Sequence, residues 1–333
     1  MPASFDWNPN VRKDMSDHMS TRRLLQIIAF VWLAILSLPS NAEATSVRKV
    51  LVLHSYHQGF LWTDMIQEGL SRTLSNSSPK TELFVEYMNT KRQAAETMFP
   101  HLARLYKQAY QNVKFDVIVA SDNNALDFLL LYRDSLFPGV PVVFCGINNS
   151  SSYRFDPDSN YTGVREDLDI VSTISIALKM HPETKKIALI TDVTTSGQIN
   201  LDLARSVAGQ FPAIDFIELN KLTATQLTDR LKQLEGDTVV LALSFFRDPE
   251  GKIFTHRESM EFIVSASPRP VYTVWDFYMA PGALGGKLLS GRSQGENAAA
   301  LAGRVLRGAQ AGSLPLIDSP TEYTFDYAGS TAS

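Results

Sequence analysis

Short apolar runs alternate with amphipathic stretches along most of the chain. Continuous runs rich in Val, Ile and Leu predict four buried strands in the first half, at 49–53, 83–87, 116–120 and 140–145. Apolar residues at helical spacing predict the intervening helices, at 62–74, 93–111 and 123–132. Pro100 is expected to interrupt the second helix. Continuous apolar strands separated by helices are typical of a parallel sheet that is covered on both faces.

The same alternation restarts after residues 161–164. It predicts strands at 186–190, 214–219, 238–243 and 271–274. It predicts helices at 171–180, 199–211, 225–234, 255–265 and 295–307. Two successive sets of similar size predict an α/β protein with two Rossmann-like lobes, each built on a parallel sheet and joined by crossover hinge segments. Such sheets bind ligands beyond the carboxyl ends of their strands, so the candidate site residues are sought there.

The lobes are expected to divide the chain unevenly. We place an amino-terminal lobe at 45–160, completed by part of 270–325, a carboxy-terminal lobe at 161–269 and a tail at 326–333. The hinge is expected near 149–163 and in two later strands. A length of 333 residues suits two lobes, because single domains usually have about 100–200 residues.

Residues 1–44 have the pattern of a secretory signal peptide with an upstream extension. Arg22 and Arg23 precede an apolar run at 24–38, and Ala42-Glu43-Ala44 follows as a cleavage site. The run is shorter than the roughly twenty residues that a membrane-spanning helix needs. We therefore expect export to the periplasm, with an uncleaved amino-terminal membrane anchor as the competing interpretation.

Charge and cysteine content exclude some classes of function. Lys and Arg number 31 and Asp and Glu number 35, and no basic face stands out, so nothing favours a nucleic-acid partner. The single cysteine, Cys145, excludes an internal disulfide. It lies in an apolar run, where we interpret it as a small core residue.

Several segments carry a recognisable signature, in this order: 50–64 (VLVLHSYHQGFLWTD), 115–125 (FDVIVASDNNA), 137–148 (FPGVPVVFCGIN), 282–286 (GALGG), and an alanine-rich helix that ends at Gly308. Over about 47–325 the chain resembles the ABC-transporter substrate-binding-like family. The resemblance is closest to members that are extracytoplasmic sensor domains of bacterial histidine kinases and diguanylate cyclases. It implies a type I periplasmic binding-protein fold and a small-molecule ligand.

The resemblance implies two rival roles. One is the substrate-binding component of an ABC transport system, with a permease as partner. The other is the sensory domain of a signalling receptor, with a membrane-bound kinase or cyclase as partner. Sensor members continue into a second membrane span and cytoplasmic modules, which this sequence does not contain. We therefore expect either a free-standing binding protein or a fragment of a longer receptor.

The candidate ligand contacts after the first strand are His54, Ser55, Tyr56, Phe60 and Trp62. Aromatic rings supply stacking area, while Ser and His supply a few placed hydrogen bonds, as small-ligand sites require. The competing interpretation is that Phe60 and Trp62 pack the first helix against the sheet. His54 and His57 would form a metal pair only with further ligands, which do not cluster near them in the sequence, so no metal is predicted.

The candidates after the third and fourth strands are Ser121, Asp122, Asn123, Gly146 and Asn148. Ser and Asp side chains are good helix N-caps, so we expect Ser121-Asp122-Asn123 to cap the helix that follows. The same backbone N–H groups can hold a carboxylate or phosphate, so capping and ligand contact are compatible.

The candidates from the second lobe are Asp192, Thr194, Thr195, Ser244, Trp275 and Asp276. Residues 191–197 open a helix with four hydroxyls and a glycine, which suits either a polar ligand group or an ordinary capped loop. Trp275 would form a wall of the cleft, and Asp276 would bind a ligand ammonium or hydroxyl group.

No catalytic residue and no cofactor are predicted. The sequence lacks a G-x-G-x-x-G after its first strand, a complete phosphate loop and a G-x-S-x-G elbow. An exported hydrolase or reductase is the alternative, with Ser121, Asp122 or Asp276 as the groups to mutate, and a structural domain with a sealed cleft is the last option. The leading hypothesis is an exported protein that closes two lobes on a small ligand, such as an amino acid, nucleoside, sugar or aromatic acid.

Overall fold

The computed structural model describes residues 47–148, 153–156 and 158–326. The expected signal peptide, part of the expected hinge and nearly all of the expected tail lie outside the described residues. The compact unit Ser46–Ser333 holds two six-stranded sheets, one in each lobe. No helix within the described ranges is both long and apolar enough to cross a bilayer.

The first sheet is wholly parallel, in the order β11-β5-β4-β3-β1-β2. Its strands are β1 (Arg48–His54), β2 (Thr81–Tyr87), β3 (Val117–Ser121), β4 (Val142–Ile147), β5 (Tyr161–Arg165) and β11 (Ile317–Asp318). Every residue of β3 and β4 is buried, because helices cover both faces, and this accounts for the continuous apolar runs.

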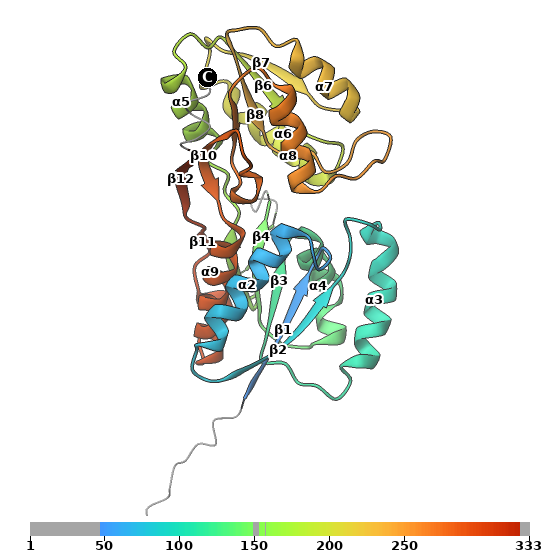
Figure 1. Cartoon of the computed structure of the whole chain (residues 1–333). Helices are drawn as coiled ribbons and strands as arrows, with labels where there is room; N and C mark the ends of the chain where they lie inside the picture. The colour runs from blue at the N-terminus through green and yellow to red at the C-terminus, as the bar shows by residue number, and fades with distance from the viewer. Residues whose placement is uncertain (1–46, 149–152, 157, 327–333) are drawn as a thin grey trace, which may run out of the picture. The chain divides into compact units, whose positions relative to one another are not determined.

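Two helices pack on each face of the first sheet (Figure 1). They are α2 (Leu61–Ser75) with α9 (Gly291–Leu306) on one face, and α3 (Ala95–Ala109) with α4 (Asn123–Leu136) on the other. Alternate residues of β1 serve the two faces: Val50 and Val52 join the α2 side, while Leu51 and Leu53 join the α3 side.

Helices α2 and α9 come from distant parts of the sequence and lie side by side (Figure 1). Glycines allow their backbones to approach closely. A Cβ atom at Gly295 would lie 2.1 Å from the carbonyl oxygen of Ile66, and one at Gly69 would lie 2.3 Å from that of Arg292. Neither position has room for any side chain, so these glycines set the distance between the helices.

The second sheet has the order β12-β10-β9-β8-β6-β7 and is parallel except for β12. Its strands are β6 (Lys186–Ile190), β7 (Asp215–Leu219), β8 (Thr238–Ala242), β9 (Val271–Thr273), β10 (Ala283–Leu289) and β12 (Thr321–Phe325). The helices of this half are α5 (Ile170–Met180), α6 (Thr195–Ala208), α7 (Ala224–Lys232) and α8 (His256–Ala266). Short 3-10 turns are η2 (Asp276–Tyr278) and η3 (Ala311–Ser313).

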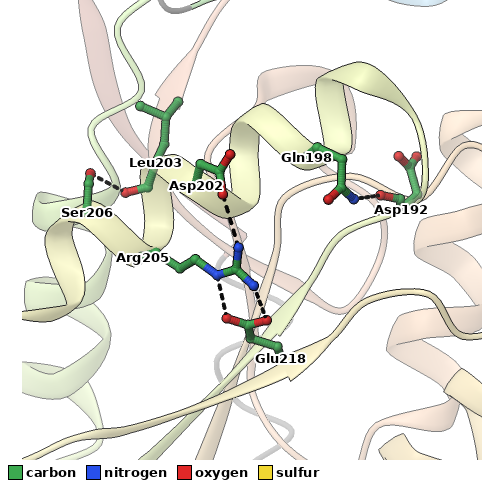
Figure 2. A network of polar contacts seen from close by, with 7 residues as sticks. All are labelled: Asp192, Gln198, Asp202, Leu203, Arg205, Ser206 and Glu218. Carbon is green, nitrogen blue, oxygen red and sulfur yellow. Dashed lines mark hydrogen bonds and ion pairs between the residues drawn. The ribbon is translucent and has the colours of Figure 1, made fainter.

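Helix α6 is fixed to β7 by a surface ion-pair network (Figure 2). Two nitrogens of the Arg205 guanidinium donate to the two carboxylate oxygens of Glu218, each at 2.7 Å. A third donates to Asp202, one turn earlier on the same helix, at 3.1 Å. At the start of α6, the Gln198 side chain donates to the carbonyl oxygen of Asp192 (Figure 2). The network orients the helix whose first turns reach the site.

The predicted fold class, two α/β lobes with mainly parallel sheets, is confirmed. The prediction that Pro100 interrupts its helix is wrong, because α3 runs through it. One missing hydrogen-bond donor is offset by burial of Phe99, Leu102 and Tyr106 on the inner face of the same helix.

The structure contains a long strand, β10, that the apolar pattern does not predict. Gly285 and Gly286 interrupt its apolar run, and both have positive φ values, 121° and 155°. A Cβ at Gly285 would lie 1.9 Å from the carbonyl oxygen of Thr324, in the paired strand β12. Close strand approach therefore selects glycine where a strand pattern would require an apolar side chain.

Strand pairing assigns segments to lobes more finely than the expected boundaries, which stay a prediction. Strand β5 lies inside the range expected for the second lobe, yet it pairs with β4 in the first sheet. Strands β9 and β10 pair within the second sheet, whereas α9 and β11 return to the first lobe. The chain therefore passes between the lobes after β5, after β10 and again between β11 and β12.

Candidate functional site

Four strands of the first sheet end at one edge, where polar residues follow them. The register pairs His54 of β1 with Ser121 of β3, and Ser121 with Cys145 of β4. Asp122 follows β3 and Glu166 follows β5. Because parallel strands point the same way, these residues gather at the carboxyl edge of the sheet.

A cavity of about 40 Å³, here called the inner chamber, is lined by residues of both lobes. Its lining consists of Tyr56, Phe60, Trp62, Lys91, Asp122, Asn148, Glu166, Ser196, Asn200, Leu243, Phe246, Trp275 and Phe277. Six of these thirteen residues are aromatic, and the charged groups are two carboxyls and one ammonium. A buried water needs roughly 10–15 Å³ of such volume, so the chamber has room for a few waters or for one small polar group.

Aromatic rings of the two lobes touch around the inner chamber. The ring centroid of Trp62, on α2, lies 5.4 Å from that of Trp275 and 5.6 Å from that of Phe277. The ring of Phe60 lies 5.7 Å from that of Phe246. All three pairs are edge-to-face, a favourable geometry for aromatic pairs. Phe60 and Trp62 thus line the chamber and also pack the first helix, so the two interpretations of these residues hold together.

Asp122 is buried at the edge of the first sheet and held by two side-chain donors. Its carboxylate accepts hydrogen bonds from Trp62 Nε1 and from the Ser121 hydroxyl, each at 2.8 Å. Burial raises the pKa of Asp122 to about 6, although both hydrogen bonds oppose that rise. The backbone has a φ of 70°, a left-handed conformation that Asp tolerates better than most residues.

The prediction that Ser121-Asp122-Asn123 caps the next helix through a side chain is wrong for Asp122, the residue that immediately precedes α4. Its carboxylate faces Trp62 and Ser121 instead of the helix. The Ser55 hydroxyl oxygen accepts the hydrogen bond from the Ala125 backbone N–H, at 2.8 Å. Ser55, which directly follows β1, thus accepts a hydrogen bond from the first turn of α4 in place of Asp122. The Asp122 carboxylate lines the chamber instead.

Glu166 is a second buried carboxyl group in the inner chamber, and its side chain is 8% exposed. The side-chain amide of Asn148 donates a hydrogen bond to it. Burial holds the pKa of Glu166 well above its ordinary range, and the neighbouring Asp122 raises it further. Both effects would be relieved by a cation placed beside the two carboxyls.

Among the described residues, Lys91 is the one charged residue that lines three cavities: the inner chamber, a larger polar cavity, and a third that is also lined by His57 and His256. Its ammonium donates to the Ser196 hydroxyl at 3.1 Å and lies 4.4 Å from the centroid of the Tyr56 ring. Burial lowers the pKa of Lys91, while Asp192, Asp122 and Glu166 act in the opposite direction. The carbonyl oxygen of Lys91 accepts from the Arg247 guanidinium of the second lobe.

Asn200, on α6, lines the same chamber and carries a buried acceptor without a donor in the described part of the chain. Its side chain is 2% exposed, and its Oδ1 atom has no hydrogen-bond donor among the described residues. A buried acceptor without a donor costs about 1–3 kcal/mol. The second lobe therefore offers a site for a hydrogen-bond donor opposite the carboxyls of the first.

A larger and more polar cavity, here called the outer chamber, has a volume of about 430 Å³. It shares Tyr56, Lys91, Asn148 and Ser196 with the inner chamber. Its other lining residues are Thr90, Asn123, Asn124, Asp127, Tyr153, Val193, Thr194, Thr195, Ile199 and Arg247. The shared residues form the boundary between an aromatic inner space and a polar outer one.

Nine of the predicted site residues line these chambers. Tyr56, Phe60, Trp62, Asp122, Asn148 and Trp275 line the inner one, and Asn123, Thr194 and Thr195 line the outer one. Thr194 also caps α6, since its hydroxyl oxygen accepts from the Gly197 backbone N–H. Ligand contact by these residues stays a prediction.

The other predicted residues line neither chamber. They are His54, Ser55, Ser121, Gly146, Asp192, Ser244 and Asp276. His54 lies under the sheet edge, bonded to Gln67 at 2.8 Å and stacked on Tyr87. Gly146 donates its backbone N–H to Gln294 of α9. Within the described residues, no group of three or more His, Cys, Asp or Glu side chains could hold a metal ion.

Sequence reasoning missed several chamber residues, chiefly Lys91, Glu166, Asn200, Phe246 and Phe277. Glu166 immediately follows a strand, so the strand-end rule would have found it had β5 been assigned to the first sheet. Phe246 lies two residues beyond the predicted Ser244. Lys91 lies in the loop after β2 and Asn200 inside a helix, and neither has a local signal.

A comparison with protein-family models and with curated proteins finds no match. Solved structures do match in fold. One is a ligand-free, open substrate-binding protein from Clostridium difficile (13% identity, 84% of this chain and 92% of that one, TM-score 0.63). Another is an ABC domain in complex with L-Trp from Streptococcus pneumoniae (16%, 86% and 94%, TM-score 0.60). A third is a carbohydrate transporter from Acidothermus cellulolyticus in complex with myo-inositol (15%, 86% and 96%, TM-score 0.55). The chain has the fold of type I periplasmic binding proteins.

Proposed function

We propose that the chain is an exported small-molecule-binding protein that closes its two lobes on a ligand. The observation that carries the proposal is the inner chamber, where buried charged and aromatic side chains of both lobes meet. Pockets with an apolar wall and a few converging polar groups are the usual sites for small ligands. Proteins of the same fold bind L-Trp and myo-inositol, which lends support to a small-molecule ligand.

The contacts between the two lobes support the proposed closure. Lys91 of the first lobe bonds to Ser196 of the second, and Arg247 of the second lobe bonds back to the Lys91 carbonyl. A ligand that touches both lobes stabilises the closed form relative to an open one, by its differential affinity for the two. The closed form then presents the cargo to a permease or carries the signal to a kinase or cyclase, in both cases from the periplasm.

Native mass spectrometry of the full chain, purified without denaturation, tests binding directly. We expect a bound small molecule that is lost on unfolding. An empty protein that also gains no thermal stability from any compound of a broad metabolite panel would contradict the proposal. Turnover of a bound compound would favour the alternative, an enzyme acting in the same chamber.

Transport and sensing are separated by the neighbours of the coding sequence. Adjacent permease and ATPase genes would favour the transport role. A reading frame that continues into a membrane span and a kinase or cyclase module would favour the sensory role.

A further inference from the structure

The inner chamber holds several acceptors, and the Lys91 ammonium at its wall donates to Ser196 of the second lobe. Asp122 and Glu166 are buried carboxyls, and Asn200 adds a buried carbonyl oxygen without a donor. A carboxylate has about four acceptor sites, and Glu166 receives one side-chain donor, from Asn148. The ligand group that fits such a wall is one that donates several hydrogen bonds.

The charges around the chamber point to the same kind of group. Lys91 lies in the field of three carboxyl groups, those of Asp192, Asp122 and Glu166, and of one other cation, Arg247. With Glu166 protonated, as its raised pKa favours, the other four charges balance, and ionisation of Glu166 would add one negative charge. Burial lowers the pKa of the nearby His256 to about 3, so this imidazole adds no positive charge at neutral pH. The pKa of His57 is lowered as well. A ligand with one positive charge beside Glu166 would compensate that negative charge and favour the ionised form of the carboxyl.

The aromatic wall also suits a cation. The rings of Tyr56, Phe60, Trp62, Phe246, Trp275 and Phe277 surround the chamber. Aromatic faces attract ammonium groups by about 0.5–2 kcal/mol each, more where water is excluded. Lys91 already uses the Tyr56 face in this way, at 4.4 Å. The volume of about 40 Å³ matches the head of an amine and not a whole organic molecule.

We propose that Asp122, Glu166 and Asn200 form a subsite for the ammonium group of an organic ligand, whose remaining part extends into the outer chamber. This inference rests on the proposed ligand-binding function and adds the chemical class of the ligand. The ammonium donates to carboxyls of the first lobe and to the Asn200 carbonyl of the second, so it joins the lobes. Free amines and amino acids share this group.

The test is a thermal-shift and calorimetric panel on the full chain, built from matched compounds. Phenethylamine, L-phenylalanine and 3-phenylpropionate share a phenyl body and differ in charge. Putrescine and 1,4-butanediol form a further pair. We expect at least one ammonium compound to bind, and its neutral or anionic counterpart to bind at least about tenfold more weakly. L-Phenylalanine against phenethylamine then distinguishes an amino acid from a free amine.

Asp122→Asn and Glu166→Gln keep the shape of the side chains and remove their charge. Each should lower the affinity for the ammonium compound by about tenfold or more and reduce its selectivity over the neutral counterpart. Asn200→Ala should lower that affinity less. Asp202→Asn is the matched control, because this exposed carboxylate on α6 pairs with Arg205 away from the chamber (Figure 2). It should leave affinity unchanged.

Two results would overturn the subsite: equal binding of neutral or anionic counterparts, or no binding by any ammonium compound of the panel. Unchanged selectivity in both folded acid variants would do so too. Binding of neutral or anionic compounds would leave the proposed ligand-binding function standing. A protein that is empty in native mass spectrometry and unresponsive to every compound would count against that function itself.

Discussion

At the scale of single residues, two buried histidines make the fold sensitive to acid. His54 is fully buried, and burial lowers its pKa from 6.5 to about 4. A histidine whose pKa is lower in the folded state contributes stability that is complete above about pH 6.5 and is lost as the pH falls toward 4. His256 acts in the same direction, with its pKa lowered to about 3. The native structure is therefore expected to weaken on acidification.

His54→Gln should remove the part of this pH dependence that belongs to His54. One pKa unit corresponds to about 1.4 kcal/mol, so His54 accounts for about 2.5 kcal/mol of the stability lost between pH 7 and pH 4.5. Urea unfolding at both pH values would measure it. His101→Gln, at an exposed position on α3, should leave the loss unchanged. An identical loss in wild type and His54→Gln would show that other groups cause the acid sensitivity.

Residue types alone identified part of the candidate site. Asp122 and Trp275 follow strands whose apolar runs are plain in the sequence, and both line the inner chamber. Glu166 follows β5, a strand whose run Tyr161-Thr162-Gly163-Val164 marks a restart without showing which sheet it joins. Lys91 and Asn200 reach the chamber only through the packing of the two lobes. Sequence patterns predict local structure, whereas the places of Lys91 and Asn200 depend on contacts between segments that are far apart in the sequence.

At the scale of elements, the α2–α9 pair is the contact most sensitive to side-chain size. Alanine favours the helical conformation over glycine by about 1 kcal/mol, so replacing an exposed helical glycine by alanine usually stabilises a protein. At Gly295, however, a methyl group would meet the Ile66 carbonyl oxygen at 2.1 Å. Gly295→Ala should therefore destabilise the protein by about 2–3 kcal/mol, as measured by urea unfolding.

Gly303→Ala is the matched control within the same helix. A Cβ there would meet only the flexible end of Arg307, at 3.3 Å, so the helix propensity of alanine should dominate. We expect a neutral or stabilising effect of up to about 1 kcal/mol. Equal effects of the two substitutions would mean that α2 and α9 are not packed as closely as the structure shows.

The elements that the sequence predicted well are those buried on both faces. Strands β1, β3, β4, β6 and β8 stand out as continuous apolar runs, because helices cover both sides of each sheet. Strand β10 was not predicted, because its close approach to neighbouring strands requires glycine where an apolar side chain would have marked a strand. Strand β12 is mostly exposed and pairs antiparallel at a sheet edge, so it shows no apolar run. Burial, more than strand propensity, decided which elements could be predicted.

At the scale of the whole molecule, the two lobes share few but central contacts. Lys91, Ser196 and Arg247 connect them by hydrogen bonds, and Trp62 meets Trp275 and Phe277 by ring contacts. The chain has four tryptophans, and the two in the described part, Trp62 and Trp275, both lie at this junction. Tryptophan fluorescence therefore reports whether the junction is closed or open to water.

Arg247→Met should shift the ligand-free protein toward the open form, because it removes the donor to the Lys91 carbonyl while keeping much of the side-chain length. We expect a larger radius of gyration in small-angle X-ray scattering and a red-shifted tryptophan emission, as water reaches Trp62 and Trp275. Arg205→Met is the control, since Arg205 pairs with Asp202 and Glu218 within the second lobe (Figure 2). It should change neither measurement. If Arg247→Met also left both unchanged, closure would rest on the Lys91–Ser196 hydrogen bond and the ring contacts, and Trp62→Ala should then increase the radius of gyration.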